Sequence, residues 1–192
     1  MARLTRVESQ ARTRAQLLDA AAEVFARRGF HGASLEEVAE QAGYTRGAVY
    51  SNFSSKDELF LAVLQERMRS QVEFVADLCA RVQASDELAE VLPDLDWMDM
   101  QWCLLLFEFW LYALRNPAAG EGLAELYREY RGDVASLPAV SGWSGGGLKP
   151  EELAGATIAL YQGLALQRHI DPDAVRPDVV GRLLDALGVG GD

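Results

Sequence analysis

The chain has 192 residues, of which 49% are apolar and 24% charged, so it can bury a sizeable hydrophobic core. Its longest apolar run, residues 102–114, is shorter than the roughly 20 residues that a membrane-spanning helix needs. The first ten residues contain no apolar segment of the kind found in secretion signals. We therefore expect a globular cytoplasmic protein with no membrane partner.

The net charge of −11 argues against a protein that is basic throughout, but the charges are unevenly distributed. Residues 1–69 carry ten basic and nine acidic side chains, whereas residues 70–192 carry eight basic and twenty acidic ones. This asymmetry predicts a small N-terminal part that can meet nucleic acid, joined to an acidic second part.

Residues 1–12 are polar and arginine-rich without helical periodicity, which predicts a flexible basic arm. Such an arm is either a solvated tail or a contact to phosphate or the minor groove. The spacing of Thr13 and Gln16 predicts a capping box that starts the first helix, and Gly29 is expected to end it.

Two short helices joined by a three-residue turn are predicted between Ser34 and Phe53. Ser34 and Glu37 have capping-box spacing, Gly43 ends the first helix, and the second starts at Thr45. A connection this short forces the two helices to cross steeply, which indicates a DNA-binding helix-turn-helix. Small or polar side chains of the second helix can approach phosphates or read base edges, and these are Thr45, Arg46, Gly47, Ala48, Tyr50, Ser51 and Asn52.

Residues 13–69 resemble the N-terminal signature of the TetR (AcrR) family of bacterial transcriptional regulators. The residues at family spacing are Phe25, Gly29, Ser34, Val38, Ala39, Ala42, Gly43, Thr45, Gly47, Tyr50, Phe53, Lys56 and Leu59. The resemblance implies that Arg46 and its neighbours read bases. It implies phosphate contacts from Ser34, Thr45, Tyr50 and Lys56.

Two positions depart from the family pattern, namely Tyr44, where a small aliphatic residue is common, and Asn52, where an aromatic residue or histidine is usual. The base preference of relatives therefore does not carry over. Ser34 and Thr45 are expected to cap helices whatever else they contact, and Tyr50 could instead belong to the core. The candidate DNA-binding residues are Ser34, Tyr44, Thr45, Arg46, Gly47, Ala48, Tyr50, Ser51, Asn52 and Lys56.

The remainder of the chain shows helical periodicity and no sustained strand alternation, which predicts an all-α fold. After a capping box at Ser55 and Glu58, helices are expected over 59–82, 88–92, 98–115, 121–134, 151–169 and 177–187. The expected domains are a three-helix helix-turn-helix domain over 13–55 and a helical ligand-binding and dimerisation domain over 56–192.

Aromatic side chains gather in the second part and either form core or line a cavity for a mostly apolar effector. Glu108 is the sharpest candidate, because a carboxylate in such an apolar helix must be paired, protonated, at a surface edge or facing a cavity. The candidate ligand-binding residues are Met68, Gln71, Trp102, Phe107, Glu108, Trp110, Tyr127 and Gln162.

The last two predicted helices carry more apolar surface than the end of a small domain can bury. The family resemblance implies that they form a four-helix dimer interface, and the expected interface residues are Leu153, Ile158, Tyr161, Val180, Leu183, Leu184 and Leu187. A twofold homodimer presents two recognition helices, so we expect it to bind a palindromic operator. The sequence thus predicts a regulator, a repressor by family tendency, that a small effector releases from double-stranded DNA.

Two alternatives remain. Cys79 and Cys103 could form a thiol-based redox sensor, although both lie in apolar helical patterns. Residues 142–146 match a nucleophile elbow that would make Ser144 a hydrolase nucleophile, but this motif needs an α/β sheet around it. With two histidines, His31 and His169, no metal cluster is expected, and neither a cofactor nor an enzymatic activity is predicted.

Overall fold

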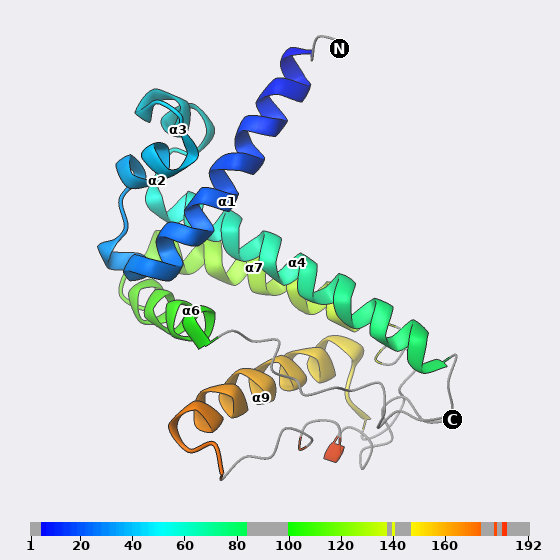
Figure 1. The fold of residues 1–192 in the computed structure, drawn as a ribbon. Helices are drawn as coiled ribbons and strands as arrows, with labels where there is room; N and C mark the ends of the chain where they lie inside the picture. The colour runs from blue at the N-terminus through cyan, green and yellow to red at the C-terminus, as the bar shows by residue number, and fades with distance from the viewer. Residues whose placement is uncertain are drawn as a thin grey trace. The chain divides into compact units, whose positions relative to one another are not determined.

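The computed structural model describes residues 5–83, 100–137, 140, 147–173, 179, 182 and 183, and seven helices are seen within these residues. The helices are α1 (Arg6–Gly32), α2 (Leu35–Ala42), α3 (Arg46–Asn52), α4 (Lys56–Gln83), α6 (Met100–Ala113), α7 (Pro117–Ala135) and α9 (Pro150–Ile170) (Figure 1). The predicted all-α fold is confirmed. The helix expected over 88–92, and most of the one expected over 177–187, lie outside the described residues. No described helix has both the length and the apolar character that crossing a bilayer requires.

The chain divides into two compact units. The first comprises Met1–Arg67 and Leu105–Leu123, and the second comprises Met68–Leu104 and Ala124–Asp192. This division differs from the expected domains over 13–55 and 56–192, because the first unit extends into α4 and includes the larger part of α6.

Helix α1 begins at Arg6, so the flexible arm expected up to residue 12 is wrong for residues 6–12. Thr5 caps the helix by accepting a hydrogen bond from the backbone amide of Glu8 (3.2 Å), and the Glu8 carboxylate accepts from the amide of Thr5 (2.7 Å). The box expected at Thr13 is also wrong, since the Thr13 hydroxyl donates to the carbonyl of Ser9 (3.0 Å) inside the helix. The capping box of Thr5 and Glu8, eight residues earlier in the chain, starts the helix instead.

The helix-turn-helix forms as the sequence predicts. Ser34 and Glu37 make a reciprocal capping box, and Gly43 ends α2 with a φ of 70°, a left-handed conformation that favours glycine. The hydroxyl of Thr45 caps α3 by accepting from the amide of Ala48 (3.3 Å). Val49 of α3 and Phe53, the residue that follows the helix, are fully buried.

An aromatic core holds the first unit together. Phe25 and Phe30 of α1, Phe60 of α4 and Phe109 of α6 are each at most 1% exposed. The ring centroids lie 4.3 Å apart for Phe60 and Phe109 and 4.9 Å apart for Phe30 and Phe109. Since aromatic burial and edge-to-face contacts both stabilise such a cluster, α6 packs as part of the same core as α1 and α4.

The last turn of α1, after Gly29, and the residue that caps it, Ala33, are held by a carboxylate and an ammonium group from two other helices. Gly29, with a φ of 71°, interrupts α1, so the amides that follow it lack the usual helical acceptors. The Glu108 carboxylate of α6 accepts from the amides of Phe30 (2.9 Å) and His31 (3.0 Å). The Lys56 ammonium of α4 donates to the carbonyls of Ala33 (3.1 Å) and His31 (3.4 Å). We call Glu108, Lys56 and backbone 30–33 the backbone clamp.

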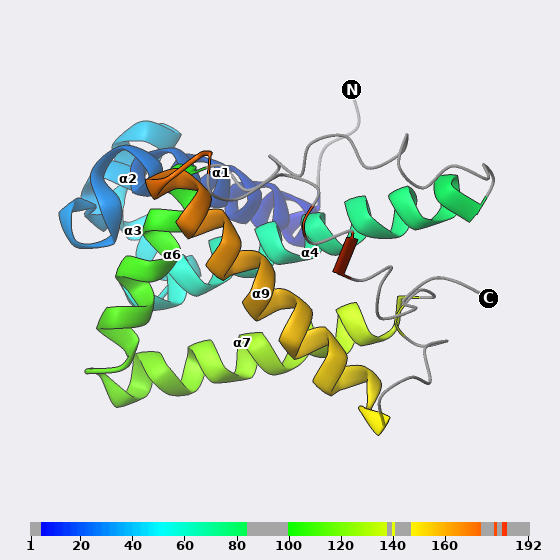
Figure 2. The ribbon, with the colours of Figure 1, turned by 90° about the horizontal axis from the view of Figure 1, so that it is seen from below.

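In the second unit, α9 crosses α7 (Figure 2). The crossing is fixed by a hydrogen bond from the Gln162 amide to the Tyr127 hydroxyl, 2.8 Å long. A small apolar cluster joins α4, α7 and α9 and consists of Val72, Val75, Ala76, Val134, Leu137, Val140 and Leu153.

We predict that Glu108→Ala lowers the free energy of unfolding by about 1–3 kcal/mol, because it leaves the amides of Phe30 and His31 without their acceptor. Urea denaturation of the full chain measures this loss. Glu121→Ala, at an exposed position of α7 in the same unit, is the matched control and should stay within about 0.5 kcal/mol of the wild type. Equal losses for the two variants would contradict a stabilising role for the clamp.

Candidate functional site

Helix α3 presents a polar surface to solvent. The Arg46 side chain is 65% exposed and Tyr50 is 45% exposed, so Tyr50 is not a core residue. Thr45, Gly47 and Ser51 are also exposed, whereas Ala48 and Asn52 are half-buried. The predicted recognition residues therefore share one accessible helix.

Arg46 is held in place by residues of α2 and α3. It pairs with the carboxylate of Glu36 (2.8 Å) and donates to the hydroxyl of Tyr50 (3.3 Å), with its guanidinium 5.3 Å from the centre of the Tyr50 ring. The hydrogen bond to Tyr50, and then the charge of Glu36, raise the pKa of Arg46. An exposed ion pair is worth only about 0–1 kcal/mol, so a phosphate or a base edge can replace Glu36 as a partner.

Ser51 and Asn52 direct their donors inward. Both side chains donate to the carbonyl of Ala48, at 2.9 Å for Ser51 and 2.8 Å for Asn52. Their oxygen atoms remain able to accept hydrogen bonds.

Helix α1 supports α3 through two side chains that the sequence did not assign to the site. Gln16 accepts a hydrogen bond from the hydroxyl of Tyr44 (2.6 Å). Arg14 donates to the carbonyl of Asn52 (3.1 Å), and its guanidinium lies 4.3 Å from the centre of the Phe53 ring. The arginine-rich composition around Arg14 was visible in the sequence, but its partner 38 residues away was not.

Ser34 and Lys56 have structural roles beside their predicted phosphate contacts. Ser34 caps α2, and the ammonium of Lys56 donates two hydrogen bonds within the backbone clamp. Because an ammonium carries three donors, the third remains for a phosphate.

The predicted ligand-binding residues fall in different units. Phe107, Glu108 and Trp110 belong to the first unit, and Met68, Gln71, Trp102, Tyr127 and Gln162 belong to the second. Glu108 is satisfied by backbone amides in the clamp, a partner that the sequence did not suggest. The Glu108 carboxylate therefore has hydrogen-bond partners without a ligand.

Buried polar and aromatic side chains meet in the second unit. Gln162 of α9 is 6% exposed and donates to Tyr127, while Tyr130 donates to the amide oxygen of Gln71 in α4 (3.3 Å). The rings of Tyr127 and Tyr130 pack edge to face with centroids 6.5 Å apart. Burial, and then the neighbouring Tyr127, raise the pKa of Tyr130 to about 12, so its hydroxyl stays protonated. The described residues provide no partner for the carbonyl oxygen of Gln162.

Three of the predicted dimer residues face the chain's own interior. Leu153, Ile158 and Tyr161 are at most 9% exposed, which corrects their expected place on a free surface. Leu153 packs with residues of α4 and α7, and the helical period leaves Ala156 and Ala159 exposed on α9. Leu183 is 41% exposed, and Val180, Leu184 and Leu187 lie outside the described residues.

The two alternative functions find no support in the structure. Cys103 is a free, buried cysteine, and burial raises the pKa of its thiol, which disfavours the reactive thiolate. Ser144 and the side chain of Cys79 lie outside the part of the chain that is described. Within that part, no three His, Cys, Asp or Glu side chains are grouped to hold a metal ion.

Comparison with known proteins relates both parts of the chain to regulators. The profile of bacterial regulatory proteins of the tetR family matches residues 17–63, and that of the C-terminal part of BetI-type transcriptional repressors matches residues 81–187. The nicotine-responsive transcriptional repressor HdnoR of Paenarthrobacter nicotinovorans is 30% identical over 179 residues, which cover 90% of this chain and 92% of that protein.

Solved structures agree. A TetR-family member from Streptomyces coelicolor A3 is 27% identical with a TM-score of 0.61, covering 91% of this chain and 97% of that one. The multidrug binding protein EbrR complexed with imidazole is 26% identical with a TM-score of 0.64, covering 91% of this chain and 93% of that one. EbrR has also been solved with proflavin. From both profiles and the alignment with HdnoR, the chain belongs to the TetR family of bacterial regulatory proteins and is a DNA-binding transcriptional regulator.

Proposed function

We propose that the protein is a homodimeric repressor that binds a palindromic operator through α3 and leaves it when a small, largely apolar effector binds the second unit. The observation that carries the DNA-binding part is the exposed pair of Arg46 and Tyr50 on a helix whose underside is fully buried. Its role is regulatory and not catalytic, and it acts in the cytoplasm, where bacterial DNA is.

In this proposal Arg46 and Tyr50 read base edges or phosphates from the major groove, with Thr45, Gly47 and Ala48 allowing the backbone to approach. Ser34, Tyr44 and Lys56 contact phosphates at the edges of α3. Ser51 and Asn52 act as acceptors, because their donors are engaged with Ala48. The exposed ion pair between Glu36 and Arg46 must break when Arg46 binds DNA.

We place the dimer interface on α9 and on residues 177–187. The exposed Ala156 and Ala159, with the partly exposed Leu160 and Gly163, form a row of mostly small side chains along α9. Such a row allows a second helix to approach closely, and twofold symmetry then sets two α3 helices against successive grooves.

For the effector, we infer an aromatic compound with a nitrogen donor, bound among Gln71, Tyr127, Tyr130 and Gln162, and we keep Met68 and Trp102 of the same unit as further candidates. The carbonyl oxygen of the buried Gln162, which has no partner among the described residues, would accept from an N–H group, and the tyrosine rings would pack against a flat ring. HdnoR is named for its response to nicotine, and EbrR holds proflavin or imidazole, which are all nitrogen heterocycles.

The effector acts by binding one arrangement of the dimer more tightly than the other. The long helix α4 supplies residues to both units, so a shift of α4 would change the separation of the two α3 helices. Release from the operator then follows from the difference in effector affinity between the two arrangements.

Arg46→Ala should weaken binding to the operator by about 1–3 kcal/mol, roughly 5- to 150-fold, because it removes a base or phosphate contact. The probe is a duplex that the wild-type protein selects from a randomised pool, and the assay is fluorescence anisotropy at fixed salt. Arg115→Ala, an exposed arginine of the first unit outside the helix-turn-helix, is the control and should bind as the wild type does. Circular dichroism and sedimentation must show the same fold and a dimer for all three proteins. Unchanged affinity for Arg46→Ala would remove it from the interface.

Gln162→Leu should weaken binding of proflavin by about two- to tenfold, the effect of losing one hydrogen bond, while operator affinity without proflavin stays unchanged. Proflavin fluorescence during titration measures the affinity. Gln167→Leu, at an exposed position of the same helix, is the matched control. No binding by the wild type would contradict the proposed effector class, and equal affinities for the two variants would place the ligand elsewhere.

A further inference from the structure

The face of α1 that packs on the core continues past the core as a polar face. Leu17, Ala20, Ala21 and Val24 are buried on this face. Counting back from Leu17 by helical steps of three or four residues gives Thr13, Gln10 and Arg6 on the same row. The side chains of Arg6 and Gln10 have no hydrogen-bond or ion-pair partner among the described residues.

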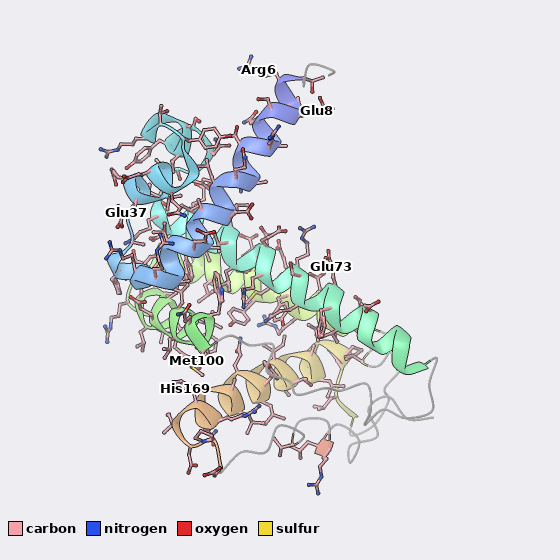
Figure 3. The ribbon with its side chains drawn as sticks, in the orientation of Figure 1. Arg6, Glu8, Glu37, Glu73, Met100 and His169 are labelled. Atoms are coloured by element: carbon pink, nitrogen blue, oxygen red, sulfur yellow. The ribbon has the colours of Figure 1, made fainter. Side chains whose placement is uncertain are left out.

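Acidic side chains of α1 keep to the opposite side. Glu8, Asp19 and Glu23 share an outer row with Arg12, at successive spacings of four, seven and four residues along the helix. In Figure 3, Arg6 leaves α1 toward the side where α2 and α3 lie, and Glu8 leaves on the other side. The inner row therefore carries a positive charge and an amide with no acidic side chain beside them.

The inner row extends beyond α3. The bonds from Arg14 to Asn52 and from Tyr44 to Gln16 fix residues 14–16 of α1 against the recognition helix and its preceding turn. Arg6 lies eight residues earlier, about 12 Å along the helix axis. A duplex bound by α3 extends past this helix in both directions, so the first turns of α1, around Arg6, can reach its sugar–phosphate backbone.

We propose that the first two turns of α1 are a second DNA contact, in which Arg6 and Gln10 bind the operator backbone beside the groove that α3 occupies. The inference rests on the proposed operator binding by α3. The helical cap at Thr5 matters here, because it holds Arg6 and Gln10 in register with α3, which a flexible arm would not do. Contacts of this kind add affinity and fix position without selecting sequence.

The test compares Arg6→Ala with Arg12→Ala in the full-length protein, on the duplex selected from a randomised pool by the wild type. Both changes remove one arginine from exposed turns of the same helix, and alanine preserves the helix. Each lost phosphate contact lowers the slope of log affinity against log salt by about 0.9, so a dimer that loses two should show a slope smaller by about 1.8. The ratio of wild-type to Arg6→Ala affinity should then fall about twelvefold between about 50 and about 200 mM salt, and Arg12→Ala should keep the wild-type slope.

A second measurement locates the contact. In each duplex of a series, one phosphate is replaced by an uncharged methylphosphonate, and the affinity of the wild type and of Arg6→Ala is measured for every duplex. At one position in each half-site, the replacement should weaken binding by the wild type and leave binding by Arg6→Ala unchanged. Equal slopes for Arg6→Ala and the wild type, or identical scans, would overturn this inference while leaving binding by α3 intact. Absence of any duplex binding by the wild type would overturn the proposed function and the inference with it.

Discussion

The last turn of α1 and its cap at Ala33 are held by opposite charges, and the orientation of the helix-turn-helix that follows depends on these contacts. The Glu108 carboxylate accepts hydrogen bonds from the amides of Phe30 and His31, and the Lys56 ammonium donates hydrogen bonds to the carbonyls of His31 and Ala33. Glu108 satisfies amides that follow the interruption at Gly29, and Lys56 satisfies carbonyls that have no helical donor because α1 ends at Gly32. Hydrogen bonds to charged groups are about twice as strong as neutral ones, so the clamp fixes where α2 begins.

The aromatic core and the clamp bring α6 into the DNA-binding unit. Phe109 packs on Phe30 and Phe60, and one turn along the helix Tyr112 donates to Asp57 of α4 (3.0 Å). A carbon atom added at Gly29 would meet the Glu108 carboxylate at 2.8 Å, so this glycine provides both the backbone conformation and the space for the clamp. Any shift of α6 is thereby felt at the entry to α2.

The sequence predicted what short-range patterns determine. The capping box at Ser34 and the helix end at Gly43 were predicted correctly, because each depends on neighbours within a few residues. The capping residue of α1 was placed eight residues late, since the spacing of Thr13 and Gln16 has the same form as the capping box observed at Thr5 and Glu8. Partners far apart in the chain were not predictable: Glu108 was assigned to a ligand because nothing in its own helix identifies two amides 77 and 78 residues away. Likewise, the helical periodicity of α9 predicted a row of apolar side chains, but it did not indicate whether this row packs against α7 or against a second chain.

The most direct test of the clamp is amide hydrogen exchange at Phe30 and His31 in the full-length protein. Both amides follow a break in α1, and the amide of His31 lies in an exposed setting, so without Glu108 the exchange of His31 would approach that of an open chain. The clamp predicts slow exchange at both amides in the wild type, and faster exchange at both in Glu108→Ala while the amides of Val24 and Phe25 keep their protection. Fast exchange at Phe30 and His31 in the wild type would contradict it.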